Sequence, residues 1–293
     1  MHAIRGVPGL SAEGGTSSPI VRVENTHAVA RVALHGAQVL TYVPRGSNPI
    51  LWLSPRAVFS PGRAVRGGVP ICWPWFGPHP TDETKPNHGF ARLSVWALDA
   101  AWTTEDGGHK MMFRFPMEAG AAAGWKQSFD LRLTVSVGPV LELALTTRNT
   151  GDSPLTVGGA LHGYFAVSDI RKVRVSGLEG RAFVDQRNPA ERRVQKGPVE
   201  IGAETDRVYD DPGNRCVIED PLLARRIVVE KSGSRSTVLW NPWLEKARAF
   251  SDVGEDQYRD FLCVEPANAL SNVVTLAPGE GHCLTASIHA EPM

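Results

Sequence analysis

The 293-residue sequence has no run of 18 consecutive apolar residues and contains only four cysteines. Without such a run, no helix is expected to span a membrane. The cysteines show no Cys-x-x-Cys spacing and are far apart, at Cys72, Cys216, Cys263 and Cys283. This spacing argues against a zinc site and against a disulfide framework. Buried free thiols in a reducing cytoplasm are the simpler interpretation.

An excess of charge of either sign is also absent, because 31 Lys and Arg residues balance 31 Asp and Glu residues. Proteins that bind nucleic acid or a membrane surface need a cationic face. We therefore expect no nucleic-acid and no membrane partner. The first residues, MHAIRGVPGLSAEGG, lack an apolar core of signal-peptide length, and we expect a cytoplasmic protein.

The familiar cofactor motifs are missing as well. The sequence has no G-x-x-x-x-G-K-[ST], no Rossmann glycine run after a strand, no G-x-S-x-G and no H-E-x-x-H. These motifs mark nucleotide-binding loops, dinucleotide-binding folds, serine hydrolases and zinc proteases. The sequence therefore predicts neither a cofactor nor a metal centre.

The main structural signal that is present is a period of two. Apolar residues alternate with polar ones in LRLTVSV, and after a Gly-Pro turn the alternation resumes in VLELALTTRN. The pattern predicts a β-hairpin over residues 131–149. Gly and Pro, 29 and 22 in number, interrupt almost every helical window. We therefore expect an all-β fold, a large and mainly antiparallel β-sandwich.

No linker, repeat or charge block divides the chain. This uniformity predicts one domain over residues 1–293, in which residues 1–18 form a loosely ordered N-terminal segment. Nothing in the sequence requires more than a monomer.

Residues 63–92, RAVRGGVPICWPWFGPHPTDETKPNHGFAR, have neither helical nor strand periodicity. The prolines stiffen such a loop, and the guanidinium groups of arginine bind anions through paired hydrogen bonds. A loop of this composition is suited to hold cations in fixed positions.

Three ionisable residues stand in apolar or strand-like surroundings: His162 in ALHGYFAV, Glu265 in FLCVEPAN and Asp206 in ETDRVYDD. An unpaired buried carboxylate is costly, so Glu265 needs a partner or a chemical role. Each residue also has a structural explanation. His162 can be satisfied within the core, Arg207 can neutralise Asp206, and Glu265 can end a strand before Pro266.

Five motifs, VRGGVPICWPWFG, NHGFAR, LHGYF, TDRVY and CVEPAN, occur in this order between about residues 65 and 270. Together they resemble the hexose-6-phosphate mutarotases, the glucose-6-phosphate 1-epimerase branch of the aldose 1-epimerase (galactose mutarotase-like) family. The resemblance implies a large β-sandwich, in agreement with the strand pattern. It also implies interconversion of the α and β anomers of a small-molecule sugar phosphate, without metal or nucleotide.

The resemblance further implies roles for individual residues. His162 matches the general acid and Glu265 the general base, and five residues match substrate contacts: Arg66, Asn87, His88, Arg92 and Asp206. The sequence departs from the family at Asn87, where relatives often carry Gln, so the amide has a shorter reach.

Within residues 63–92 we expect Arg66 and Arg92 to hold the phosphate with their guanidinium groups close together. Gly67 and Gly68 are interpreted as allowing the backbone to approach a ligand. Arg63 and Lys85 are expected to be solvated surface charges, whereas Trp73, Trp75 and Phe76 fit either a floor beneath the sugar ring or the core.

Three other functions remain open. A mutarotase for unphosphorylated aldoses would use the same acid and base. A non-catalytic carbohydrate-binding module would keep the arginines and aromatic residues but would not need both His162 and Glu265. A glycoside hydrolase would use two carboxylates, such as Asp206 and Glu265, and would leave His162 unexplained.

Overall fold

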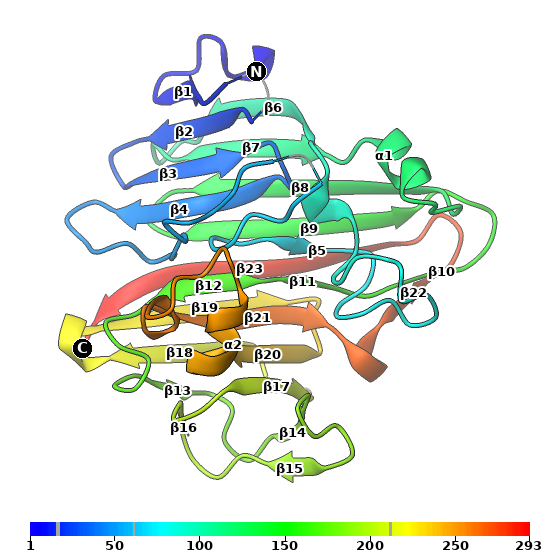
Figure 1. Cartoon of the computed structure of the whole chain (residues 1–293). Helices are drawn as coiled ribbons and strands as arrows, with labels where there is room; N and C mark the ends of the chain where they lie inside the picture. The colour runs from blue at the N-terminus through cyan, green and yellow to red at the C-terminus, as the bar shows by residue number, and fades with distance from the viewer. Residues whose placement is uncertain (16–17, 61, 211–212) are drawn as a thin grey trace.

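The computed structural model describes residues 1–15, 18–60, 62–210 and 213–293 (Figure 1). Strands form most of the secondary structure, and the α-helices of the described residues are the short α1 (Met117–Ala122) and α2 (Trp243–Ala249). None of the described helices is long and apolar enough to cross a membrane.

One layer is a nine-stranded sheet in the order β16-β13-β18-β19-β23-β9-β8-β7-β6. Its strands are β6 (Ala97–Thr103), β7 (His109–Arg114), β8 (Phe129–Val137), β9 (Leu141–Asn149), β13 (Arg174–Ser176), β16 (Val199–Glu200), β18 (Arg215–Asp220), β19 (Arg225–Ser232) and β23 (Gly281–Pro292). All of its pairings are antiparallel.

A second sheet follows the order β15-β14-β17-β20-β21-β11-β5, with β12 also paired to β21. Its strands are β5 (Ile71–Cys72), β11 (Gly159–Leu161), β12 (Gly163–Ala166), β14 (Ala182–Asp185), β15 (Arg192–Val194), β17 (Thr205–Asp210), β20 (Ser236–Asn241) and β21 (Phe261–Asn268). A four-stranded sheet holds β1 (Leu10–Glu13), β2 (Ile20–Glu24), β3 (Ala28–Ala33) and β4 (Gln38–Pro44), and β10 (Leu155–Val157) pairs with β22 (Val274–Leu276). Figure 1 shows these sheets stacked on the nine-stranded layer, so the predicted antiparallel β-sandwich is confirmed.

The predicted hairpin is β8 and β9, which pair from Phe129↔Asn149 to Val137↔Leu141. Its alternate residues are buried between the layers, including Leu133 and Leu141, both fully inaccessible to solvent. Burying a leucine side chain contributes about 1.5–3 kcal/mol. The period of two therefore identified both the strands and the face that packs into the core.

The N-terminal segment is more regular than expected. β1 pairs with β2 from Leu10↔Val23 to Glu13↔Ile20, and the Pro8 carbonyl oxygen lies 2.7 Å from the Nε2 of His109. Residues 10–13 are thus held by backbone pairing. Residues 16 and 17 lie outside the described residues.

Residues 63–92 contain only β5 and the 3₁₀ turn η2 (Ala91–Leu93) among their described residues. Gly67 and Gly68 have positive φ angles of 107° and 62°. A Cβ added to Gly68 would lie 2.1 Å from the Val39 carbonyl oxygen, and one added to Gly67 would lie 2.6 Å from the Leu53 Cα. Our interpretation that these glycines let the backbone approach a ligand was therefore wrong, since they make room for neighbouring backbone instead.

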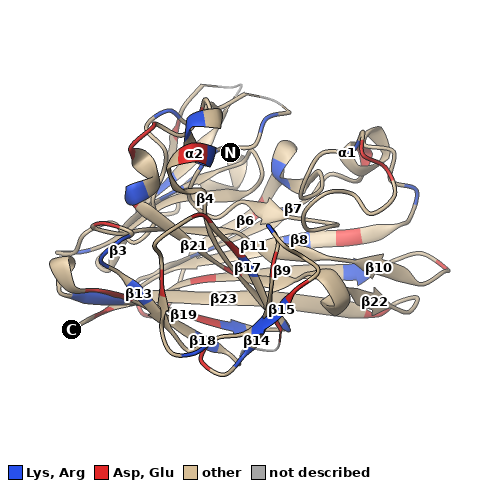
Figure 2. Ribbon diagram, turned by 60° about the horizontal axis from the view of Figure 1, so that its bottom comes forward, with Lys and Arg blue, Asp and Glu red and all other residues tan. Residues whose placement is uncertain are grey.

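Basic and acidic residues are interspersed along the ribbon (Figure 2). This distribution agrees with the zero net charge of the sequence. Three of the cysteines are buried free thiols, as expected, whereas Cys283 is exposed.

Candidate active site

All the predicted site residues line one cavity of about 670 Å³: Arg66, Asn87, His88, Arg92, His162, Asp206 and Glu265. They come from the loop of residues 63–92 and from one face of the eight-stranded sheet. On that face, Asp206 of β17 lies opposite Trp240 of β20, and Val238 of β20 lies opposite Glu265 of β21. The fold thus gathers residues that are far apart in the sequence.

His162 and Glu265 face each other across adjacent strand segments. The pairs Ala160↔Ala267 and Gly163↔Val264 flank them and set the register. The His162 Nε2 lies 3.4 Å from the Glu265 Oε1, and the two side chains are only 8% and 1% exposed. The other atoms, His162 Nδ1 and Glu265 Oε2, are buried with no hydrogen-bond partner among the described residues. An unsatisfied buried polar atom is costly, so these atoms mark places where a polar ligand would bind.

Burial shifts the pKa values of these two residues in opposite directions. It lowers the pKa of His162 well below its usual range, and electrostatic interactions with His88 and Arg92 lower it further. Burial also raises the pKa of Glu265 well above its usual range. Asp206 raises this pKa further, whereas Arg92 lowers it. Both neutral forms are therefore favoured in the empty cavity. Because the groups are so close, the proton belongs to the pair rather than to either residue.

Arg66 is held from three sides. Its Nη2 lies 3.2 Å from the Asp252 Oδ1, its Nη1 donates a hydrogen bond of 3.1 Å to the Tyr164 hydroxyl, and its guanidinium carbon lies 4.7 Å from the centre of the Phe250 ring. The Tyr164 ring in turn stacks on His162, with 4.8 Å between centroids and 8° between planes. The Nε of Arg66 is buried and has no hydrogen-bond partner in the described part of the chain.

The motif NHGFAR places three of its residues at the cavity. The Nη2 of Arg92 donates to the Asn87 carbonyl oxygen at 2.8 Å, and its Nε is buried without a partner among the described residues. The Nδ1 of His88 accepts from the Gly77 amide at 3.2 Å. Burial lowers the pKa of His88 to about 3, with further contributions from Arg92 and Arg66. Neutral His88 therefore carries its proton on Nε2, where it can donate to a ligand.

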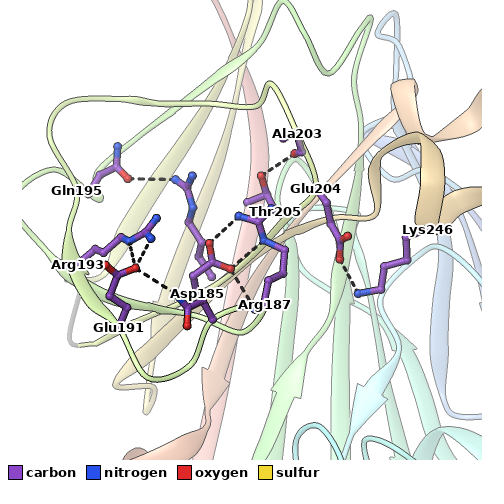
Figure 3. A network of polar contacts seen from close by, with 11 residues as sticks. Asp185, Arg187, Glu191, Arg193, Gln195, Ala203, Glu204, Thr205 and Lys246 are labelled. Carbon is purple, nitrogen blue, oxygen red and sulfur yellow. Dashed lines mark hydrogen bonds and ion pairs between the residues drawn. The ribbon is translucent and has the colours of Figure 1, made fainter.

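Asp206 lies at the side of the cavity lined by Gln186 and Lys246. Burial raises the pKa of Asp206 to about 6, although Lys246 opposes this shift. The Lys246 ammonium is itself bonded to Glu204 at 2.8 Å, as Figure 3 shows. Arg207 points to Gln195 instead, at 3.3 Å. The expected ion pair between Arg207 and Asp206 therefore does not form.

The aromatic residues of the loop divide between core and cavity. Phe76 lines the cavity, whereas Trp73 is 2% exposed and packs against Phe129 with 4.5 Å between ring centroids. Trp75 is 8% exposed and donates to the Pro86 carbonyl oxygen. Lys85 donates to the Ala123 carbonyl oxygen at 2.8 Å, so it is tied to the protein rather than freely solvated.

Sequence reasoning missed several cavity residues: Tyr164, Gln186, Trp240, Lys246, Phe250 and Asp252. Tyr164 could have been found, because it lies two residues after His162 and alternate strand residues share a face. The others had no local signal, since β14, β20, α2 and the loop after α2 bring them to the cavity only through the fold. Arg63, expected to be a surface charge, also lines the cavity.

One group of potential metal ligands occurs among the described residues: His162, Cys263 and Glu265, whose ligand atoms lie within 4.8 Å of one another. Burial raises the pKa of Cys263 well above its usual range, so its thiol is protonated. Within this group, His162 and Glu265 form a dyad suited to proton transfer.

The sequence from residue 19 to residue 289 matches the family model described as aldose 1-epimerase. The chain belongs to the aldose 1-epimerase family. A member from Cenchrus ciliaris, provisionally named glucose-6-phosphate 1-epimerase, is 38% identical over 266 residues, which cover 86% of this chain and 78% of the relative. A protein of the same provisional name from Escherichia coli K12 is 37% identical over 263 residues, covering 89% and 87%.

Solved structures of aldose 1-epimerase type agree. The crystal structure of a provisionally named mutarotase from Salmonella typhimurium superposes with a TM-score of 0.91 at 33% identity, over 99% of this chain and 96% of that one. Galactose 1-epimerase from Lactobacillus acidophilus shares the fold, with a TM-score of 0.73 at 15% identity over 97% and 98%. The family resemblance inferred from the five motifs is thereby confirmed.

Proposed function

We propose that this aldose 1-epimerase interconverts the α and β anomers of a hexose 6-phosphate, as a glucose-6-phosphate 1-epimerase. Two lines of support meet in this proposal. Relatives at 37–38% identity carry that name. In addition, the cavity combines a buried acid–base pair with arginine side chains, so it offers both proton transfer and anion binding.

The observation that carries the proposal is the opposition of His162 and Glu265 at 3.4 Å in a cavity large enough for a sugar. Mutarotation requires a base for the O1 hydroxyl proton and an acid for the ring oxygen. Glu265 takes the O1 proton while His162 protonates the ring oxygen, and the bond between C1 and the ring oxygen breaks. The aldehyde rotates about C1–C2, and the ring closes on its other face by the reverse transfers.

The charge state of the pair supports this sequence of steps. In the ring-opened state, Glu265 holds the proton and His162 is neutral. Burial favours the same distribution in the empty cavity, because it raises the pKa of Glu265 and lowers that of His162. Ring opening as described starts from ionised Glu265 and protonated His162, so the shared proton passes from Glu265 to His162, 3.4 Å away, before the ring opens. General acid–base catalysis of this kind contributes about 10²–10⁴-fold.

The remaining residues are proposed substrate contacts. Asp206 and Asn87 are positioned to hold sugar hydroxyl groups, and His88 offers its Nε2 proton. Arg66 offers its Nε, which has no partner among the described residues, and Arg92 contributes charge to bind the phosphate. The enzyme is predicted to act as a monomer in the cytoplasm.

Anomer exchange measured by NMR tests the function. Enzyme added to an equilibrium mixture of glucose 6-phosphate anomers should accelerate exchange between their H1 resonances. The same experiment with free glucose separates this function from that of a mutarotase for unphosphorylated aldoses. Equal acceleration of both sugars would favour the latter, and acceleration of neither would favour a non-catalytic binding module.

A further inference from the structure

The cavity is lined by four cationic side chains, and the proposed function requires that some of them bind a phosphate. Arg66 and Lys246 each have a carboxylate partner, at 3.2 Å in Asp252 and at 2.8 Å in Glu204. Their charges are therefore largely compensated within the protein. Arg66 is further fixed by Tyr164 and Phe250, so both of its terminal nitrogens are already engaged.

Arg63 and Arg92 differ from this pair. Neither forms an ion pair with any residue in the described part of the chain, and the Arg63 side chain makes no hydrogen bond there. Arginine remains charged at every accessible pH. The cavity thus holds two positive charges that have no ion-pair partner among the described residues. A phosphate monoester carries about −1.5 to −2 at pH 7, which matches them.

The segments that carry these two arginines contact the same turn. The turn between β3 and β4 contacts both segments: the Nε2 of buried His35 lies 2.7 Å from the Arg63 carbonyl oxygen, and His35 bridges to Val95. The Gly36 amide donates to Ser94 at 2.7 Å, and a Cβ on Gly36 would lie 3.2 Å from the Arg92 Cα. One turn therefore contacts the backbone at both arginine-bearing segments.

We propose that Arg63 is a phosphate-binding residue that acts with Arg92 and determines the preference for a phosphorylated over a free hexose. Arg66, held by Asp252 and Tyr164, instead forms the wall beside the acid–base pair. This inference rests on the proposed function. It assigns the second positive charge at the phosphate, beside that of Arg92, to Arg63 rather than to Arg66. A loop arginine without an internal partner is free to close on an anion.

Arg63→Ala tests the inference, with Arg56→Ala as the matched control because Arg56 is exposed in the same loop region and does not line the cavity. The kcat/KM for glucose 6-phosphate should fall about 10- to 100-fold in Arg63→Ala, the usual effect of losing hydrogen bonds to a charged group. The change should appear mainly in KM. Arg63→Lys should lose less, and Arg56→Ala should behave as wild type.

Two further measurements sharpen the test. Exchange of free glucose, where measurable, should change less than twofold in Arg63→Ala, because free glucose has no phosphate. Inorganic phosphate should inhibit the wild type competitively, and its inhibition constant should rise about tenfold or more in Arg63→Ala. Thermal unfolding of the variants shows whether the loop remains folded.

The outcomes separate the inference from the function on which it rests. If the wild type prefers glucose 6-phosphate and Arg63→Ala retains that preference, the role of Arg63 is overturned while the function stands. Equal losses on both sugars would also overturn it, since Arg63 would then support the loop. If the wild type itself shows no preference for the phosphorylated sugar, the proposed function fails.

Discussion

The Nε2 of His162 lies 3.4 Å from the Oε1 of Glu265, although His162 lies between β11 and β12 and Glu265 belongs to β21, with β13 to β20 between them in the chain. Both side chains are buried, and each has a further polar atom without a partner in the described structure. A pair that served only to stabilise the core would satisfy these atoms. The arrangement is that of groups held ready for a ligand.

Glu265→Gln should remove most of the catalysis of anomer exchange while leaving the fold intact, because the amide keeps the shape but cannot accept a proton. A loss of about 10²-fold or more in kcat is expected, and His162→Asn should behave similarly. The measurement is NMR exchange of glucose 6-phosphate, with Glu142→Gln on the exposed face of β9 as the control. Exchange near the wild-type rate in either site variant would remove that residue from the mechanism.

The pH dependence of kcat should reflect a pair that must hold one proton. An isolated histidine loses its proton near pH 6.5. The raised pKa of Glu265 keeps the proton in the pair above that pH, so activity should persist through neutral pH. The lowered pKa of His162 places the second protonation below pH 6.5, where activity should fall. A profile from pH 5 to 9 that loses half its activity on the alkaline side near 6.5 would contradict the shifts.

Glu265 should also make stability depend on pH. Its raised folded-state pKa means that the folded protein keeps the proton above pH 4.5, whereas the unfolded chain releases it. This group therefore favours unfolding increasingly as the pH rises from about 4.5 to the folded-state pKa, by up to about 1.4 kcal/mol per pH unit. The free energy of unfolding of Glu265→Gln, relative to wild type, should rise over this range. A difference that stays constant from pH 4.5 to 7 would show an ordinary pKa.

Arg92→Ala should weaken turnover of glucose 6-phosphate by about 1.5–3 kcal/mol in kcat/KM, because a hydrogen bond to a charged group is lost. Arg92→Lys should lie between this variant and wild type, since the charge survives but the fork geometry does not. Activity on free glucose should change far less. If Arg92→Ala affects both sugars equally, Arg92 holds the loop through the Asn87 carbonyl oxygen instead.

Asp252→Asn should lower kcat more than it raises KM. Asp252 holds Arg66, Arg66 donates to the Tyr164 hydroxyl, and the Tyr164 ring stacks on His162. Loss of the carboxylate charge frees the Arg66 guanidinium, so the stack that orients the imidazole loosens. Asp256→Asn is the control, because Asp256 is 82% exposed and only 3.9 Å from Arg259. A rise in KM alone would mean that Asp252 acts on substrate binding rather than on His162.

Several features follow from the sequence without the fold. The alternation of Leu131, Leu133 and Val135 predicts the β8–β9 hairpin, because a strand whose face is buried must repeat every two residues. The five motifs identify the family and with it His162 and Glu265. Both signals lie within short stretches of sequence, so they can be recognised without knowing the tertiary structure.

Other features were decided by tertiary structure alone. The sequence suggested that Gly67 and Gly68 let the backbone approach a ligand. In the structure they lie against the backbone of Leu53 and Val39 instead. Arg66 was expected to hold the phosphate, yet Asp252, on the loop after α2, forms an ion pair with it, whereas Arg63 has no ion-pair partner among the described residues. Charge balance in a cavity depends on which distant side chains meet there. The pairing of strands far apart in the chain determines which side chains meet in the cavity. The spacing of residues within one segment cannot predict these contacts.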